Sequence, residues 1–429
     1  MSDNRVGVHT LANGMRVLLA PCEAESVAVG VFIASGSRHE PPRFAGISHL
    51  IEHMLFKGTP TRKSVDITRA IEGRGGVFNA MTGEEATCYY AHLPDEYLDE
   101  AVDILSDMYL RATIPDDEFE REKQVVVEEI RMYADEPDSV AMENLQRAIF
   151  PGSALGTPVA GTPESLAPLR PADLRRYIKS HYRADNTVLV VVGSFEAGKA
   201  LELVRRAFSP LKKPKAPFGT LLPPTYSLPV SGRPDPSHVS VEKDVQQAQL
   251  ALGYRTFGLL DQRKYAATVM DAVLGRGMSS RLFQEVREKR GLSYDISSRQ
   301  MFFSDAGMFT VTAGVAPSKA DRALATVDRE LRRICERRVS SGELRRTKDF
   351  LVGNFRLSHG RVTARLFFYG QTMLAFGRLV TPSEQVDGVR AVTADDVQAA
   401  ARAVFRASRR SVSWVVPRGG ADVAEGGAK

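Results

Sequence analysis

Residues 44–56, F-A-G-I-S-H-L-I-E-H-M-L-F, constrain this chain more than any other stretch. Written as a helix, the stretch is apolar on nearly every side, which is typical of a buried helix. At about 100° per residue, however, His49, Glu52 and His53 lie along one edge of it. Burying two imidazoles and a carboxylate costs free energy unless a partner binds them. Zn²⁺ is the natural partner, because two neutral imidazoles four residues apart can bind one ion.

A second stretch, residues 115–133, supplies further carboxylates. Its apolar residues recur with helical period and define a buried stripe: Phe119, Val126, Ile130 and Tyr133. Glu122 and Glu129 fall at the margin of this stripe, whereas Glu128 points about 180° away from Phe119. Two carboxylates that face the interior need a partner. We therefore expect Glu129 to join His49 and His53 around one zinc ion per chain.

Two histidines and one glutamate leave one position of a tetrahedral zinc ion open, as in catalytic sites. An ion there would lower the pKa of a water molecule from about 16 toward about 7. Glu52 is placed to take the proton of that water and to pass it to the leaving amine. Glu122 is suited to hydrogen-bond a ligand and fix its orientation. The expected chemistry is hydrolysis, of a peptide bond above all.

The 429 residues are too many for one ordinary core, and the chain reads as two related domains. Residues 1–211 end in a buried strand and a helix, and the proline-rich stretch 212–236 reads as a linker. Residues 237–418 repeat the same order of elements, and 419–429 are expected to be disordered. The repeat lacks the metal ligands: Thr347 aligns with Glu122 and Asn354 with Glu129. The turn G-R-G-M-S-S-R at 275–281 lacks the pattern of a phosphate-binding loop and reads as the end of a helix.

Composition excludes several other classes of protein. The net charge of +5 is spread along the chain, so we expect no nucleic-acid surface. No apolar run approaches a membrane span, and the N-terminus has no signal-like segment. Three widely spaced cysteines, Cys22, Cys88 and Cys335, fit a reducing compartment. We therefore expect a cytoplasmic protein without membrane insertion.

The combination of H-L-I-E-H (49–53) and E-E-I, with Glu129 seventy-six positions after His53, resembles the pitrilysin/insulinase superfamily of inverzincin peptidases. This superfamily includes the mitochondrial processing peptidase and its bacterial relatives. Further blocks resemble it in order along almost the whole chain: G-G-V-F-N-A-M-T (75–82), H-Y-R-A-D-N-T-V-L-V-V-V-G (181–193) and L-F-Q-E-V-R-E-K-R-G-L-S-Y (282–294). The resemblance implies an α+β fold of two homologous domains, each a mostly antiparallel sheet covered by helices, forming half of a clamshell.

The resemblance also implies roles for residues outside the metal centre. The strand with Asn79 and Ala80 would pair with an extended peptide substrate. Arg287 and Tyr294 match an arginine and a tyrosine that, in relatives, reach the scissile peptide from the other half of the clamshell. The ordinary readings are a turn-capping asparagine, a surface arginine and a core tyrosine.

Chain length sets the implied assembly. Single-chain members of the superfamily carry four such domains and this chain carries two, so the resemblance implies a homodimer around a closed chamber. A heterodimer with an inactive homologue is the alternative. The expected function is a zinc metalloendopeptidase acting on peptides or on unfolded, presequence-like segments. The competing hypotheses are a structural subunit like the core proteins of a respiratory complex, and a protease dedicated to maturing one peptide.

Overall fold

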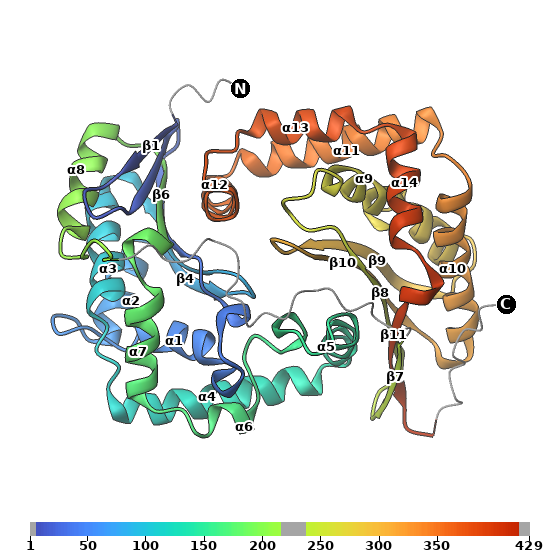
Figure 1. Ribbon diagram of the computed structural model, residues 1–429, viewed down its shortest axis with the longest axis horizontal. Coiled ribbons are helices and arrows are strands. Elements are labelled where there is room, and N and C mark those ends of the chain that lie inside the picture. The colour runs from blue at the N-terminus through green and yellow to red at the C-terminus, as the bar shows by residue number, and fades with distance from the viewer. Residues whose placement is uncertain (1–5, 216–236, 420–429) are drawn as a thin grey trace. The chain divides into compact units, whose positions relative to one another are not determined.

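The computed structural model describes residues 6–215 and 237–419 of the chain (Figure 1). Its described residues form two compact units that are not continuous in sequence. Unit 1 comprises residues 6–130, 157–215 and 356–381, and unit 2 comprises 131–156, 237–355 and 382–419. Most of the predicted linker, residues 216–236, and of the predicted tail, residues 420–429, lies outside the described residues.

Unit 1 contains a six-stranded mixed sheet in the order β1-β2-β6-β3-β5-β4. Only β2 and β6 pair in parallel; the other neighbours are antiparallel. Every residue of β6 is buried, as its continuous apolar run predicts. The bounds are β1 (Gly7–Thr10), β2 (Arg16–Pro21), β3 (Ser26–Ile33), β4 (Val77–Thr82), β5 (Thr87–Pro94) and β6 (Thr187–Gly193).

Unit 2 contains a five-stranded sheet in the order β7-β11-β8-β10-β9. Its strands correspond one by one to β2, β6, β3, β5 and β4, because β7 and β11 pair in parallel and the other neighbours are antiparallel. The predicted repeat of architecture is therefore confirmed. The bounds are β7 (Ser237–Lys243), β8 (Ala248–Thr256), β9 (Ser293–Phe302), β10 (Gly307–Val315) and β11 (Ser411–Pro417).

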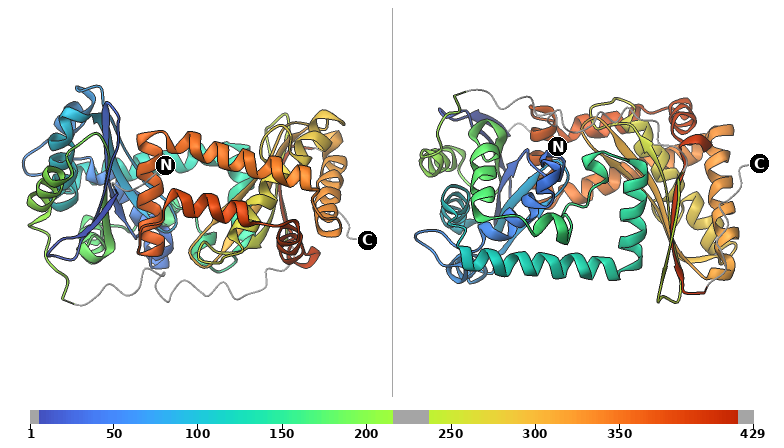
Figure 2. Two further views of the ribbon diagram at one scale, coloured as in Figure 1. Left: turned by 90° about the horizontal axis from the view of Figure 1, so that it is seen from above. Right: turned by 60° about the horizontal axis from the view of Figure 1, so that its bottom comes forward.

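Helices cover both faces of the first sheet. Alternate strand residues point to opposite faces, so β2 sends Val17 and Leu19 into one core and Leu18 and Ala20 into the other. The first core lies beneath α1 (Ile47–Leu55), α2 (Ser64–Glu72), α3 (Leu98–Arg111), α4 (Asp116–Asp135), α7 (Pro171–His181) and α8 (Ala197–Phe208). The second lies beneath α12 (Val362–Phe376), on the opposite face from α3 and α8 (Figure 2).

The second sheet is covered in the same way. One face packs against α9 (Lys264–Gly275), a π-helix (Phe283–Glu288), α10 (Ala320–Glu336) and α14 (Ala394–Val404), around the buried Trp414. The opposite face packs against α5 (Pro137–Ile149). The remaining helices are α6 (Pro163–Leu166), α11 (Ser341–His359) and α13 (Pro382–Ala391). Within the described residues, no helix combines the length and the apolar character needed to cross a bilayer.

Two helices are exchanged between the halves of the chain. Helix α5 follows α4 in the first half, yet it packs on β8 and β11 of unit 2. Helix α12 belongs to the second half, yet it packs on β3 and β6 of unit 1. Because β8 and β11 are the counterparts of β3 and β6, the exchange is reciprocal. Each sheet therefore completes its covering with a helix from the other half of the sequence.

Candidate metal centre

Helix α1 presents the predicted polar edge from an otherwise buried body. Ile47, Leu50, Ile51, Met54 and Leu55 are buried, whereas the edge that carries the two histidines and Glu52 is only partly buried. The helix begins after Gly46, whose φ of +91° is easily adopted only by glycine. A Cβ atom on Gly46 would lie 2.5 Å from the backbone oxygen of Ala160. The start of α1 therefore depends on this glycine.

A buried carboxylate that the sequence reasoning missed caps α1. Glu40 accepts hydrogen bonds from the backbone N–H groups of Gly46 and Ser48, both at 2.7 Å. These are among the donors that a helix leaves unpaired at its N-terminus. Burial raises the pKa of Glu40 to about 7, against the lowering effect of the bonds from Ser48 and Gly46. Glu40 thus fixes the end of the helix on which the two histidines stand.

Three potential ligand atoms converge between α1 and α4. The Glu129 Oε2 atom lies 3.5 Å from His53 Nε2 and 3.7 Å from His49 Nε2. One ligand atom from each of the three residues lies within 4.8 Å of the others. Glu128 is exposed, as its helical angle predicts, and Glu129 is half-buried. The structure therefore brings the three predicted ligands together.

The spacing fits a zinc ion. Ligand atoms about 2.1 Å from a tetrahedral ion lie roughly 3.4 Å from one another, close to the separations of Glu129 Oε2 from the two imidazoles. Burial lowers the pKa of His49, and the charge of His53 lowers it further. A neutral imidazole is the form that binds a metal. The buried Nδ1 atom of His49 has no hydrogen-bond partner, so among these side chains only His53 is oriented through its second nitrogen.

Glu122 orients His53 and is itself held by a lysine. The His53 Nδ1 atom lies 3.1 Å from Glu122 Oε2, which leaves Nε2 directed at Glu129. Lys57 Nζ lies 2.5 Å from the other oxygen of Glu122. The sequence reasoning missed Lys57, although its position four residues after His53 is a signal that helical spacing offers. Glu122 is 7% exposed, so the bond to Lys57 keeps a buried carboxylate paired.

Glu52 is held beside the three ligands. Thr82 at the end of β4 donates its hydroxyl proton to Glu52 Oε2 at 2.5 Å. Burial raises the pKa of Glu52, and this outweighs the lowering by the Thr82 bond and by His53. Glu129 adds to the raising effect. A partly desolvated carboxylate with a raised pKa has the properties of a general base.

Asn79 and Ala80 lie on β4, the strand at the edge of the first sheet. Asn79 is exposed, and its side-chain oxygen accepts a hydrogen bond from the Ala80 N–H at 2.8 Å. Phe78 faces inward and contacts Phe56 just after α1. The outer side of β4 is unpaired by any other strand of the described residues. Such an edge can accept an additional strand.

Arg287 and Tyr294 lie together in unit 2. The Arg287 guanidinium lies 4.8 Å from the centre of the Tyr294 ring and 4.7 Å from that of Phe283. Tyr294 is 78% exposed, which excludes the reading of a core tyrosine. Stacking on two rings holds the arginine in place while the tyrosine faces solvent. The role of the pair at a scissile bond stays a prediction.

Similarity to known sequences agrees with this geometry. The profile described as insulinase (Peptidase family M16) matches residues 16–163, and the profile described as Peptidase M16 inactive domain matches residues 168–351. The "uncharacterized zinc protease YmxG" of Bacillus subtilis is 34% identical over 398 residues, which cover 92% of this chain and 95% of that protein. The chain belongs to the insulinase family, peptidase family M16. It is of the family's short two-domain type, with the metal centre in the half that matches the first profile.

Other M16 relatives agree in sequence and in fold. An "uncharacterized zinc protease" of Streptomyces coelicolor is 34% identical, over 95% of this chain and 89% of that protein. A protease from Helicobacter pylori has the same fold, with a TM-score of 0.89 at 22% identity over 96% of this chain and 99% of that one. A chain of complex III2 from Candida albicans also shares the fold, with a TM-score of 0.81 at 21% identity over 96% of each chain.

Glu40 makes the stability of the protein dependent on pH in a defined window. The folded pKa of about 7 exceeds the ordinary value of 4.5, so this group favours the fold most at low pH. As pH rises from about 4.5 to about 7, the unfolded chain ionises first and the contribution is lost. Glu40→Gln cannot titrate, so the unfolding free energy of the wild type should fall relative to this variant by roughly 2–4 kcal/mol over that window. Urea unfolding of both proteins at several pH values measures the difference; a difference independent of pH would contradict the assignment.

Proposed function

We propose that this M16 protein is a zinc-dependent metalloendopeptidase that hydrolyses peptides or unfolded, presequence-like segments. The observation that carries the proposal is the convergence of His49 Nε2, His53 Nε2 and Glu129 Oε2 beside Glu52. The donor set, with two imidazoles and one carboxylate, is that of catalytic zinc sites with an open position. The relatives named zinc proteases support the same reading.

When bound, zinc supplies a water molecule of lowered pKa and polarises the carbonyl of the scissile bond. Glu52 takes a proton from water and passes it to the leaving nitrogen, and its raised pKa makes it a stronger base than an ordinary glutamate. Thr82 fixes the Glu52 carboxylate through one oxygen and leaves the other for that proton. Glu122 and Lys57 hold the His53 ring in orientation. The chain's own residues thus position both a metal and a base.

The substrate proposed is an extended peptide that adds to the outer edge of β4. Backbone hydrogen bonds along such an edge give affinity without strict sequence preference. Asn79 occupies the Ala80 N–H when no peptide is bound and would release it to an incoming strand. Because Thr82 of the same strand is bonded to Glu52, a peptide on β4 would run beside the base.

A chelator experiment tests the proposal. Removal of metal from the purified protein should abolish cleavage of an internally quenched peptide, because the zinc ion would supply the activated water and the electrophile for the carbonyl. Addition of one equivalent of Zn²⁺ per chain should restore it. Cleavage that persists in a protein shown to be free of metal would refute a zinc peptidase.

We also propose a homodimer in which Arg287 and Tyr294 of one subunit complete the site of the other; a heterodimer with an inactive homologue is the alternative. Mixing Glu52→Gln subunits with Arg287→Ala subunits should regenerate activity, because a mixed dimer contains one site with both residues intact. With random exchange of equal amounts, about half of the dimers carry one such site, so about a quarter of wild-type activity is expected. No recovery after exchange has been verified with labelled subunits would contradict a composite site.

The competing function is a structural subunit. The fold shared with a chain of complex III2 and the match to an inactive-domain profile favour it. Metal content discriminates the two, since about one zinc per chain supports the enzyme and none, in a stable heteromer, supports the scaffold. A protease dedicated to one peptide would instead show a single preferred substrate in a peptide library.

We also propose a cytoplasmic location. The observation that supports it is that none of the three cysteines forms a disulfide bond.

A further inference from the structure

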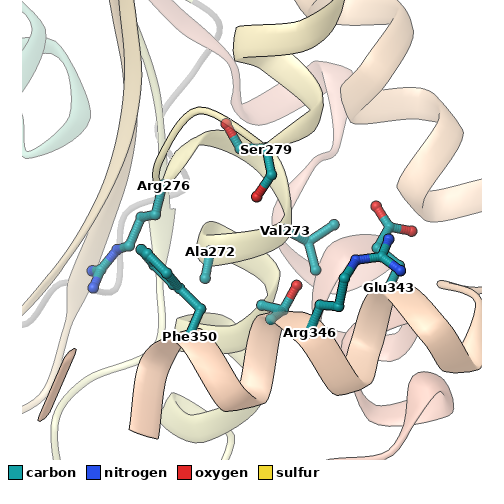
Figure 3. Close-up of a pocket in the computed structure, with 9 residues that line it drawn as sticks. Ala272, Val273, Arg276, Ser279, Glu343, Arg346 and Phe350 are labelled. Atoms are coloured by element: carbon teal, nitrogen blue, oxygen red, sulfur yellow. The ribbon is translucent and has the colours of Figure 1, made fainter. Parts of the chain in front are cut away.

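Unit 2 contains a pocket at the place that corresponds to the metal centre of unit 1. Helix α9 follows β8 as α1 follows β3, and α11 is the second helix after β10 as α4 is after β5. A pocket of about 60 Å³ lies between α9 and α11 (Figure 3). Thr347, the sequence counterpart of Glu122, is among the residues that line it. The repeat has therefore kept a cavity where the first half gathers its ligands.

The charge of this pocket is the reverse of that of the metal centre. Carboxylates and imidazoles are replaced by two arginines, Arg276 and Arg346, with one carboxylate, Glu343. Arg276 is paired with Asp271 at 2.5 Å, and Glu343 accepts two bonds from Arg281 at 2.8 Å. Arg346 is exposed to solvent and forms no ion pair within 4 Å among residues 6–215 and 237–419, although its charge acts on Glu343. The pocket therefore has, on its solvent side, an arginine that is not bound to a carboxylate.

The pKa of Glu343 also indicates an excess of positive charge around this side chain. Burial raises the pKa of this carboxyl, but the bond from Arg281 and the charges of Arg281, Arg333 and Arg346 lower it by more. The net shift is downward, so Glu343 stays ionised and already has its partner. A second anion placed near Arg346 would meet a guanidinium whose donors are free to bind it.

We propose that this pocket binds a carboxylate group carried by a peptide, held by the Arg346 guanidinium and the hydroxyl groups of Thr347 and Ser279. A volume of about 60 Å³ accommodates a group of a few heavy atoms, since one water needs roughly 10–15 Å³ measured in this way. One free cation beside an ionised glutamate suits a monoanion better than a phosphate, which carries about two charges. Phe350 forms an apolar wall that suits the carbon chain behind the carboxylate.

The turn 275–281 shapes one side of the site. Helix α9 ends at Gly275, which confirms the reading of this turn as a helix end, and Ser279 follows in the exposed loop. Gly277 has a φ of +79°, and a Cβ atom there would lie 3.4 Å from the Phe350 ring. The glycine is needed for this positive φ, whereas the space beside Phe350 would admit a Cβ atom. The group expected to bind an anion here is therefore Arg346 on α11, and the turn 275–281 does not act as a phosphate-binding loop.

The inference rests on the proposed function for its ligand, and peptide binding without cleavage tests it. The binding experiment uses full-length Glu52→Gln protein. The probes are three fluorescent peptides that differ only in their carboxylate groups and contain no acidic residue beyond those stated. One has a free C-terminal carboxylate, one is amidated but contains a single glutamate, and one is amidated without any carboxylate. A preference for the first or the second identifies which carboxylate of a peptide the pocket takes.

The matched variants are Arg346→Gln and Arg345→Gln, since both arginines are exposed on the same helix and only Arg346 lines the pocket. We expect a carboxylate-bearing peptide to bind about threefold to fivefold more tightly than the neutral one in the Arg345→Gln protein, and this preference to disappear in Arg346→Gln. Arg346→Lys, which keeps the charge but loses the fork, should retain part of it. Equal affinity for all three peptides, or equal losses in both glutamine variants, would overturn the proposal.

Failure of the pocket and failure of the proposed function give different results. Arg345 and Arg346 lie outside the metal centre, so zinc content and cleavage are measured separately on Arg345 and Arg346 variants that keep Glu52. Carboxylate-dependent binding without any turnover would keep the pocket and reject the peptidase. If the protein cleaves peptides but Arg346→Gln does not change its preference for carboxylate-bearing peptides, the peptidase is kept and the pocket is rejected.

Discussion

Glu52→Gln should lower kcat for a cleaved peptide by about 10³–10⁴-fold while the protein still folds and binds zinc. The amide cannot accept a proton from water, but its oxygen can still accept the hydrogen bond from Thr82. Burial already disfavours the ionised form of Glu52, as its raised pKa indicates, so a neutral side chain should not destabilise the fold. Steady-state kinetics, zinc content and a thermal melt measure the three expectations.

The acid side of the pH–rate profile provides a second test of Glu52. As pH falls through the pKa of Glu52, the carboxylate gains a proton and can no longer act as a base. Burial raises this pKa in the protein without metal, and a bound Zn²⁺ would lower it, so the acid limb should report the ionisation of Glu52 and should be absent from the residual activity of Glu52→Gln. Full turnover in Glu52→Gln, with zinc bound, would exclude Glu52 as the base.

Three neighbouring carboxylates of α4 should differ sharply in their effect on metal binding. Glu129→Gln removes a ligand and should weaken zinc binding on the order of a thousandfold, since roughly 10–16 kcal/mol is shared among the ligands of a zinc site. Glu122→Gln only loosens the orientation of His53 and should cost about 10–100-fold. Glu128→Gln, on the exposed side of the same helix, should have no effect.

Competition with a calibrated chelator measures the three zinc affinities on proteins of equal helicity. Glu128→Gln controls for the loss of one negative charge from this part of α4. If Glu129→Gln and Glu128→Gln bound zinc equally well, Glu129 could not be a ligand, and the centre would have to be built from other groups.

Helical periodicity accounts for the part of the site that the sequence could predict. His49, Glu52 and His53 stand on one short helix, and Glu122, Glu128 and Glu129 on another, so angles of about 100° per residue fix their directions. The partners that complete the site could not be predicted in this way. Thr82 reaches Glu52 from a strand thirty residues away, and Glu40 caps α1 from the loop before it. Only the folded structure shows these bonds.

The same periodicity failed at the far end of α4. Tyr133 was predicted to lie in the buried stripe with Val126 and Ile130, yet it is 45% exposed. The reason is that unit 1 ends at residue 130, so the last turns of α4 have left the sheet against which the stripe packs. A periodic pattern states which residues share a face but not where the neighbouring element ends. The exchange of α5 and α12 could not be predicted from the sequence either, because periodicity does not identify the sheet on which a helix packs.

The reciprocal exchange of α5 and α12 has a consequence for how such a chain can be divided. A polypeptide limited to the first repeat would keep Leu145 and Ile149 of α5 with no β8 or β11 beneath them. It would also leave Phe32 and Val190 exposed to water, because α12 is encoded several hundred nucleotides downstream. Neither repeat completes its own core, so cutting the chain between the repeats would separate each sheet from one of its covering helices.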